Sequence, residues 1–204
     1  MSENCFFIGN DVVDLCEKSN IRSFNKSRYL QKISISKEVE LISDNLIKIP
    51  FLWSAKEAAY KAVVKNISGI DIFFPKDFVI IDFEKRNQFI YSNVKYIPAK
   101  IQVCIKTFIH HDYYHSIACN TFLNINKIKY SVEKLNFNIP LNESEQVRAL
   151  LFSNLKTVSG YDDKLFTIDN QKKPYPMLIH PLNNHIDISL SHDGNYIAYA
   201  FIIC

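Results

Sequence analysis

The sequence predicts an α+β fold built from two similar halves, each a small antiparallel sheet packed with helices. Three observations support this prediction. Across 204 residues the expected elements run strand, helices, several strands, helix and several strands, an order typical of α+β chains. The strand-like segments are short apolar runs, whereas two longer segments have helical composition and periodicity. One His-x3-Tyr-x3-Ala pattern also occurs twice, over 110–118 and 192–200, and each copy enters an apolar strand.

The first half covers residues 1–125. It opens with an apolar strand, 5–8, which ends at Gly9 and runs into a polar turn. A short helix is expected over 36–42. The clearest helix is 51–65, which is rich in Ala, Glu and Lys, residues that favour helices. Four strands should follow, at 78–83, 89–94, 100–108 and 113–122.

The second half covers residues 126–204. A helix is expected over 143–157, because Leu150, Leu151 and Leu155 form an apolar stripe at helical spacing. It should end near Gly160, a residue that often terminates helices. Three strands are then expected, at 165–168, 186–190 and 196–203.

Composition excludes several classes of protein. Apolar residues make up 48% and charged residues 22%, as in ordinary globular proteins. No apolar run reaches the roughly 20 residues that span a bilayer, and the N-terminus has no signal-peptide pattern, so we expect a cytoplasmic protein that does not enter membranes. The five cysteines are scattered without a C-x-x-C pair, which argues against a zinc site or disulfide framework. A net charge of +3 is too weak to indicate nucleic-acid binding.

Two segments in the first half carry candidate functional residues. Gly9-Asn10-Asp11-Val12-Val13-Asp14 places two carboxylates where the apolar strand ends, although this segment taken alone favours a turn with solvated aspartates. On the expected helix 51–65, Glu57 and Lys61 are four residues apart and share one face. A surface salt bridge would account for that pair alone.

Two further segments lie in the second half. Gln171-Lys172-Lys173-Pro174-Tyr175-Pro176 would be a basic loop, and Ser189-Leu190-Ser191-His192-Asp193-Gly194 ends a strand. Carboxylates from separate elements suit Mg²⁺, which binds through one or two carboxylates together with substrate phosphates. Lysines and a histidine beside them suit a polyphosphate ligand. Taken together, the four segments indicate a magnesium site for a phosphate-bearing substrate.

These four segments resemble the 4′-phosphopantetheinyl transferase superfamily. Its signature is G-x-D followed, forty to fifty residues later, by W/F-x-x-K-E-A/S-x-x-K. The chain has Gly9-x-Asp11 and then Trp53-Ser54-Ala55-Lys56-Glu57-Ala58-x-x-Lys61. Segments 28–30 and 36–38 also resemble the family's residues ahead of that helix.

The resemblance extends to the second half. The larger, surfactin-synthetase-activating type has an arginine- and leucine-rich helix, a G-K-P-Y turn and N-x-S-H-S/D-G; the chain has 148–155, 173–175 and 189–194. In that type the S-H half comes first, whereas here the G-x-D half comes first, as in the shorter holo-acyl-carrier-protein synthase type. The chain thus looks like the larger type with its halves swapped, which implies a pseudo-twofold monomer with the site between the halves.

Roles follow from position within the family pattern. The resemblance implies that Asp11 and Glu57 bind Mg²⁺. The larger type usually has a third acid two residues after the aspartate, where this chain has Val13. Asp14, one residue further on, matches the shorter type's G-x-D-x-x-E and becomes the candidate third ligand.

The remaining roles concern coenzyme A, the expected substrate. Lys61 would hold the pyrophosphate, and His192 would contact a phosphate of coenzyme A. Lys173, Pro174 and Ser191 would line the nucleotide pocket, although Lys172 stands where the family usually has glycine. The other histidines form no recognisable metal set.

The resemblance implies a reaction in which the serine of an apo acyl or peptidyl carrier protein attacks the phosphate attached to the pantetheine arm. Adenosine 3′,5′-bisphosphate leaves, and Glu57 could take the serine proton. The carrier should be an acidic helical domain of fatty-acid, polyketide or peptide-synthetase type, and residues 22–32 are candidate contacts. Two alternatives stay open: a non-catalytic relative that binds carrier proteins or coenzyme A, and a different Mg²⁺ enzyme acting on a nucleotide diphosphate.

Overall fold

The computed structural model describes residues 7–25, 27–44, 47–67, 69–160, 166–169, 175–179 and 186–203. Within them the chain is a mixed α+β structure with antiparallel sheets, as the sequence predicts. The helices are α1 (Lys18–Phe24), α2 (Ser27–Ile33), α3 (Ser36–Ser43), α4 (Ile49–Val63), a short 3₁₀ turn at Pro75–Asp77, α5 (Phe122–Ile125) and α6 (Glu143–Ser159). The strands are β1 (Gly9–Asp14), β2 (Phe78–Arg86), β3 (Phe89–Tyr96), β4 (Ile101–Ile109), β5 (Tyr113–Cys119), β6 (Lys129–Lys134), β7 (Thr167–Asp169), β8 (Met177–Ile179), β9 (Ile186–Asp193) and β10 (Tyr196–Ile203).

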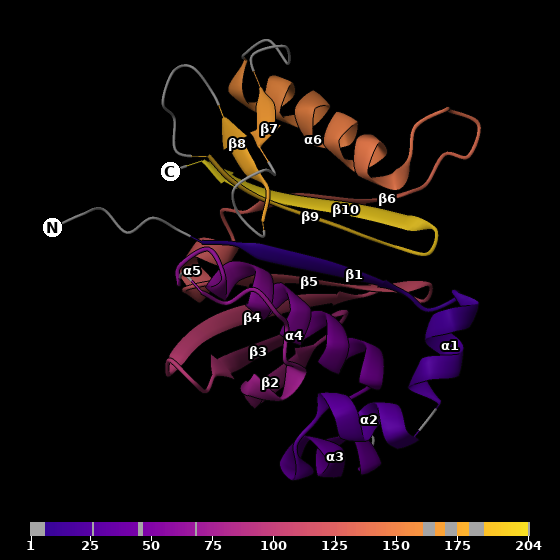
Figure 1. Ribbon diagram of the computed structural model, residues 1–204, viewed down its shortest axis with the longest axis vertical. Coiled ribbons are helices and arrows are strands. Elements are labelled where there is room, and N and C mark those ends of the chain that lie inside the picture. The colour runs from indigo at the N-terminus through magenta and orange to yellow at the C-terminus, as the bar shows by residue number, and fades with distance from the viewer. Residues whose placement is uncertain are drawn as a thin grey trace, which may run out of the picture.

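The strands form one large and two small sheets. The large sheet has the order β1-β5-β4-β3-β2; β6, β10 and β9 form a second sheet in that order, and β7 pairs with β8. In both larger sheets the first strand in sequence pairs with the last, β1 with β5 and β6 with β10. α4 covers one face of the large sheet, and α6 lies over the outer face of the second (Figure 1). The two sheets therefore share this pairing of first and last strand. A similar strand pairing does not establish a symmetry axis, so the twofold relation between the halves stays a prediction.

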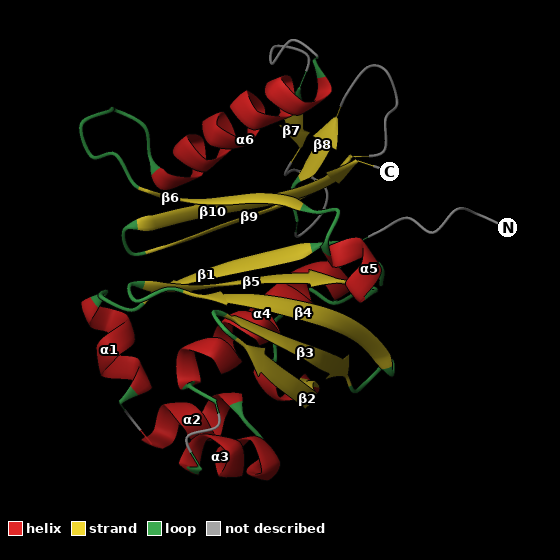
Figure 2. Ribbon diagram, turned by 180° about the vertical axis from the view of Figure 1, so that it is seen from behind, coloured by secondary structure: helices red, strands yellow, loops and turns green. Residues whose placement is uncertain are grey.

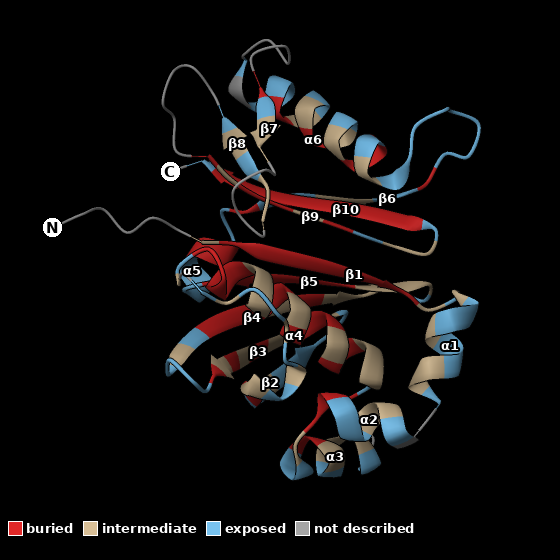
Figure 3. Ribbon diagram, viewed as in Figure 1, coloured by how far each residue is buried: buried red, intermediate tan, exposed pale blue. Residues whose placement is uncertain are grey.

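β1 is the edge strand of the large sheet and lies at the centre of the molecule, between its sheet neighbour β5 and the strands β9 and β10 of the second sheet (Figures 1 and 2). All six of its residues are buried, which Figure 3 shows as a continuous band. The prediction that a strand ends at Gly9 and a polar turn follows is wrong, because Asn10 and Asp11 pair with Ile117 and Ser116 of β5. Helix and strands cover both faces of β1, so tertiary packing overrides the turn preference of these polar residues.

Side chains of β9 join the second sheet to β1. The amide nitrogens of Ile8, Asn10 and Asp14 donate to side-chain oxygens of Asp187, Ser189 and Asp193, at 2.7, 2.8 and 2.8 Å. Each pair is separated by 179 residues, so β1 and β9 run side by side in the same direction. β9 thus satisfies the free edge of β1 through side chains, where a paired strand would use carbonyl groups.

The predicted boundary between residues 125 and 126 falls between α5 and β6. Two apolar clusters nevertheless combine residues from both sides of it. One contains Ile117 and Ile202, and another contains Val12 and Ala198. The boundary therefore separates the strands of the two larger sheets, apart from the side-by-side packing of β1 and β9. The division of the chain into two domains stays a prediction. Among the described residues, none of the helices has the length and hydropathy needed to cross a membrane.

Candidate functional site

The site begins with the close approach of β1 to α4. Gly9 faces the helix backbone, and a Cβ atom there would lie 2.0 Å from the Ala58 carbonyl oxygen and 2.8 Å from the Ala62 nitrogen. Only glycine therefore permits this spacing. Ala58 and Ala62 are themselves buried, and their small side chains leave the helix surface open to the strand. The close contact fixes the position of Asp11, which lies two residues further along the same face of β1.

The side chains of Asp11, Glu57 and Lys61 lie close together beside the contact between β1 and α4. The Lys61 ammonium lies 3.0 Å from Asp11 Oδ1 and 3.4 Å from Glu57 Oε1. The side chains of Glu57 and Lys61 are 26% and 23% exposed, whereas that of Asp11 is 7% exposed. The sequence predicted these three residues as a site, and the structure brings them together with one edge open to solvent.

The three charges perturb one another. Burial raises the pKa of Asp11 well above its ordinary value, the Glu57 carboxylate raises it further, and Lys61 partly opposes both effects. Burial alone would lower the pKa of Lys61, but the two carboxylates outweigh it and the net shift is upward. Lys61 therefore keeps its positive charge, whereas the raised pKa of Asp11 means that its carboxylate form has too little positive charge around it.

One carboxylate oxygen of Asp11 lacks a hydrogen-bond partner. Oδ2 is buried and has no hydrogen-bond partner within the described part of the chain. A buried carboxylate oxygen without a partner is costly, unless a cation or donor from outside the protein completes it. The donor set fits Mg²⁺, because Asp11 and Glu57 offer hard oxygen ligands from two rigid elements.

Asp14, the predicted third ligand, does not join this cluster. It lies three residues after Asp11, so strand alternation places it on the opposite face of β1. Its Oδ1 accepts from the Cys16 amide at 2.7 Å, and its Oδ2 accepts from the backbone amide of Asn195 at 2.9 Å. Oδ1 thus holds the main chain just after β1, and Oδ2 holds the main chain of the β9–β10 turn, so the structure gives Asp14 a positioning role.

The end of β9 lies beside this end of β1. Ser191 is buried, and its hydroxyl has no partner among the described residues. His192 points to the opposite face of β9, toward the start of α6, where its Nδ1 lies 3.4 Å from Glu143 Oε2. Asp193 is close enough for its charge to raise the pKa of Asp11. Asp193 therefore borders the cluster, and strand alternation places Ser191 on the same face of β9 as Asp193, whereas His192 is displaced toward α6.

Lys173 and Pro174, predicted to line the nucleotide pocket, lie outside the described residues. Comparison of the chain with protein-family models, with curated proteins and with solved structures finds no match in any of the three. The resemblance to phosphopantetheinyl transferases, which rests on sequence motifs, accordingly stays a prediction.

Two buried lysines support the site and were given no role from the sequence. Lys56 and Glu38 are both fully buried and form an ion pair of 2.7 Å, and Lys56 also donates to the carbonyl oxygen of Ile33 at 2.7 Å. Lys65, one turn beyond Lys61, donates to Asp187 and to the carbonyl oxygen of Ile8 at 2.9 and 2.7 Å. Lys56 anchors α4 to α2 and α3, and Lys65, two residues after α4 ends, joins the chain there to the start of β1 and to β9. Both lysines lie within the predicted helix 51–65, but their partners are distant in sequence.

Proposed function

We propose that the chain is a 4′-phosphopantetheinyl transferase, which moves the phosphopantetheine arm of coenzyme A onto a serine of an apo carrier protein. The observation that carries the proposal is the convergence of Asp11, Glu57 and Lys61, the three residues that the family resemblance marks for metal and pyrophosphate. Two carboxylates and an ammonium group at a partly open surface suit the transfer of a phosphate-bearing group.

Mg²⁺ would be held by Asp11 and Glu57, and it would supply positive charge to the pyrophosphate of coenzyme A. The unpaired Asp11 Oδ2 supports this assignment. Lys61 keeps its proton and offers a second positive charge to the pyrophosphate and to the departing adenosine 3′,5′-bisphosphate. Glu57, whose side chain is 26% exposed, can accept the proton of the attacking serine.

The carrier protein would dock beside α1 and α2. Arg22, Arg28 and Lys32, within the predicted contact region 22–32, are all exposed and basic. Next to them is a groove of about 350 Å³ whose walls include Ile21, Phe24, Ile42, Ile47 and Pro50. An acidic helix with an apolar face matches this combination of charge and apolar surface. We expect a cytoplasmic monomer that acts on such carriers.

Intact mass spectrometry of carriers tests the proposal. The protein is incubated with coenzyme A, Mg²⁺ and a panel of apo-carriers of fatty-acid, polyketide and peptide-synthetase type. We expect at least one carrier to gain one phosphopantetheine, and the gain to disappear in EDTA and in Glu57→Gln. Glu40→Gln is the matched control, because Glu40 is an exposed glutamate on α3 away from the cluster.

The other outcomes separate the alternatives. Coenzyme A binding without any carrier gaining mass would favour a non-catalytic relative. Cleavage of coenzyme A that ignores the carrier would favour a different Mg²⁺ enzyme. Either result would contradict the transferase proposal.

A further inference from the structure

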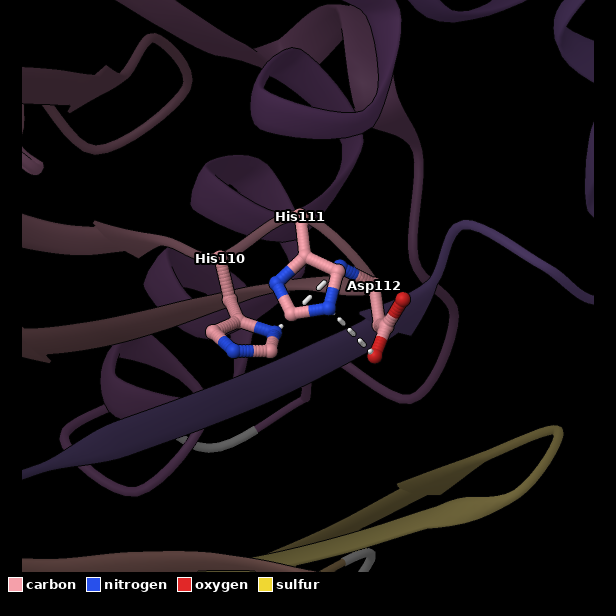
Figure 4. A group of neighbouring side chains, drawn as sticks. All are labelled: His110, His111 and Asp112. Carbon is pink, nitrogen blue, oxygen red and sulfur yellow. Dashed lines mark hydrogen bonds and ion pairs between the residues drawn. The ribbon is translucent and has the colours of Figure 1, made fainter.

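A second cluster of metal-binding side chains lies at the turn between β4 and β5. His110, His111 and Asp112 follow one another, and one ligand atom from each lies within 4.8 Å of the other two (Figure 4). His111 Nε2 stands 3.1 Å from Asp112 Oδ2, and the rings of His110 and His111 are 4.0 Å apart between centroids. No role was predicted for these histidines from the sequence, because adjacency alone does not show that side chains converge.

A fourth donor comes from another element. Cys16, a free and exposed cysteine just after β1, lies with its Sγ 3.9 Å from Asp112 Oδ1. Main-chain contacts hold it there. The Leu15 amide donates to the Asp112 carbonyl oxygen at 2.8 Å, and the Cys16 amide donates to Asp14 Oδ1 at 2.7 Å. The end of β1 and the β4–β5 turn are thus fastened together beside the four donors.

The neighbouring side chains orient two of these donors. Tyr113 stacks on the His110 ring, with centroids 4.6 Å apart and an angle of 26° between the planes. The Tyr196 hydroxyl donates to Asp112 Oδ2 at 3.3 Å. Hydrogen bonds and packing of this kind position metal ligands and set their affinity. His110 Nδ1 accepts only a long hydrogen bond of 3.3 Å from the Asp112 amide, which a metal ion could replace.

We propose that Cys16, His110, His111 and Asp112 form a site for a divalent transition metal, with Zn²⁺ the best match. Two imidazoles, a thiolate and a carboxylate are Zn²⁺ ligands, whereas Mg²⁺ prefers oxygen alone. Zn²⁺ bonds of about 2.0–2.1 Å to nitrogen and oxygen and about 2.3 Å to sulfur place tetrahedral donors roughly 3.3–3.6 Å apart. His111 Nε2 lies 3.1 Å from Asp112 Oδ2, and Cys16 Sγ lies 3.9 Å from Asp112 Oδ1. Among the described residues, the donors of His110, His111 and Asp112 lie within 4.8 Å of one another and Cys16 is not part of that group. Metal binding therefore requires rotation of the exposed side chains of Cys16 and His111, the latter 76% exposed.

The metal would cross-link the chain just after β1 to the β4–β5 turn. On binding, the S–H bond of Cys16 breaks, its proton goes to solvent, and the thiolate sulfur bonds to the metal. No atom is oxidised or reduced. The site is distinct from Asp11 and Glu57, because its donors lie on the turn and beyond the end of β1. It therefore does not depend on the proposed transferase activity.

Titration with CoCl₂ in excess MgCl₂, followed by visible and near-ultraviolet absorption, tests the proposal. Co²⁺ reports four-coordination through its visible bands and thiolate ligation through a charge-transfer band. We expect both in the wild type, at least about tenfold weaker binding in His111→Ala, and loss of the charge-transfer band in Cys16→Ser. ZnCl₂ should displace Co²⁺. Cys16 and His111 are exposed, so both variants should fold.

His192→Ala is the matched control, because His192 is a half-exposed histidine on a different hairpin. It should bind Co²⁺ as the wild type does. The proposal is overturned if His111→Ala binds Co²⁺ with unchanged affinity, if His192→Ala weakens binding as much, or if Cys16→Ser keeps the thiolate band.

Discussion

Gly9→Ala is expected to push β1 away from α4, because the added methyl group would meet backbone atoms. Its Cβ would lie 2.0 Å from the Ala58 carbonyl oxygen, whereas ordinary van der Waals contact begins at 3.4 Å. Strand and helix must therefore separate by about 1.4 Å, the difference between 3.4 and 2.0 Å. A helix carbonyl group cannot rotate aside as the tip of a side chain can, so we expect the elements themselves to move.

The displacement has two consequences. Overpacking of this kind lowers the free energy of unfolding by about 1–3 kcal/mol. It also opens the 3.0 Å contact between Lys61 and Asp11 beyond hydrogen-bond reach. A misplacement of about 1 Å can cost roughly 10²-fold in rate, so carrier modification should fall by about that factor even at temperatures where the variant stays folded.

Urea unfolding and the initial rate of carrier modification measure both effects. Gly9→Ala is compared with Ala58→Gly and with the double variant. Ala58→Gly removes a side chain but leaves the clashing carbonyl group, so the double variant should not regain activity. A Gly9→Ala protein with a free energy of unfolding within about 0.5 kcal/mol of the wild type and full activity would refute the reasoning.

Two further predictions concern buried ionisable groups. Lys56→Met should lower the free energy of unfolding by about 3–5 kcal/mol, because Glu38 would keep a buried and unpaired charge; urea unfolding checks this, and Lys56→Met combined with Glu38→Gln should recover part of the loss. Burial lowers the pKa of His115 from 6.5 to about 3. Its neutral ring therefore contributes stability above pH 6.5 that is lost as the pH falls toward 3, about 2 kcal/mol by pH 5. Urea unfolding near pH 7.5 and near pH 5 should show this loss in the wild type and its absence in His115→Gln; equal pH dependence would contradict the assignment.

Local patterns predicted the elements whose partners are near in sequence. Helix 51–65 appears as α4 at Ile49–Val63, and helix 143–157 as α6, which ends before Gly160. The last strand lies at Tyr196–Ile203, within the bounds predicted for it. These segments have the apolar spacing or the uninterrupted apolar run that their secondary structure requires. By contrast, α1 and α2 were not predicted, since α1 buries none of its residues and so shows little apolar pattern.

β1 was misplaced because its polar residues are buried by contacts far away in the chain. Asn10 contacts Ser189, and Asp14 contacts Asn195, each about 180 residues apart. Asp14 was predicted as a third ligand because it matches the family pattern G-x-D-x-x-E. That pattern does not specify the face of a strand, and strand alternation puts Asp11 and Asp14 on opposite faces of β1. Asp11, Glu57 and Lys61 could be grouped in advance because two motifs of the same family signature carry them.

The release of adenosine 3′,5′-bisphosphate tests the central claim most directly. It is measured by chromatography against the amount of apo-carrier consumed, with wild type, Glu57→Gln, Lys61→Met and the Glu40→Gln control. We predict one nucleotide for each carrier modified, and a rate roughly 10²–10⁴-fold lower in Glu57→Gln if its carboxylate takes the serine proton. Lys61→Met should also be slow, and Glu40→Gln should match the wild type. Nucleotide release that needs no carrier, or that persists unchanged in Glu57→Gln and Lys61→Met, would contradict the account.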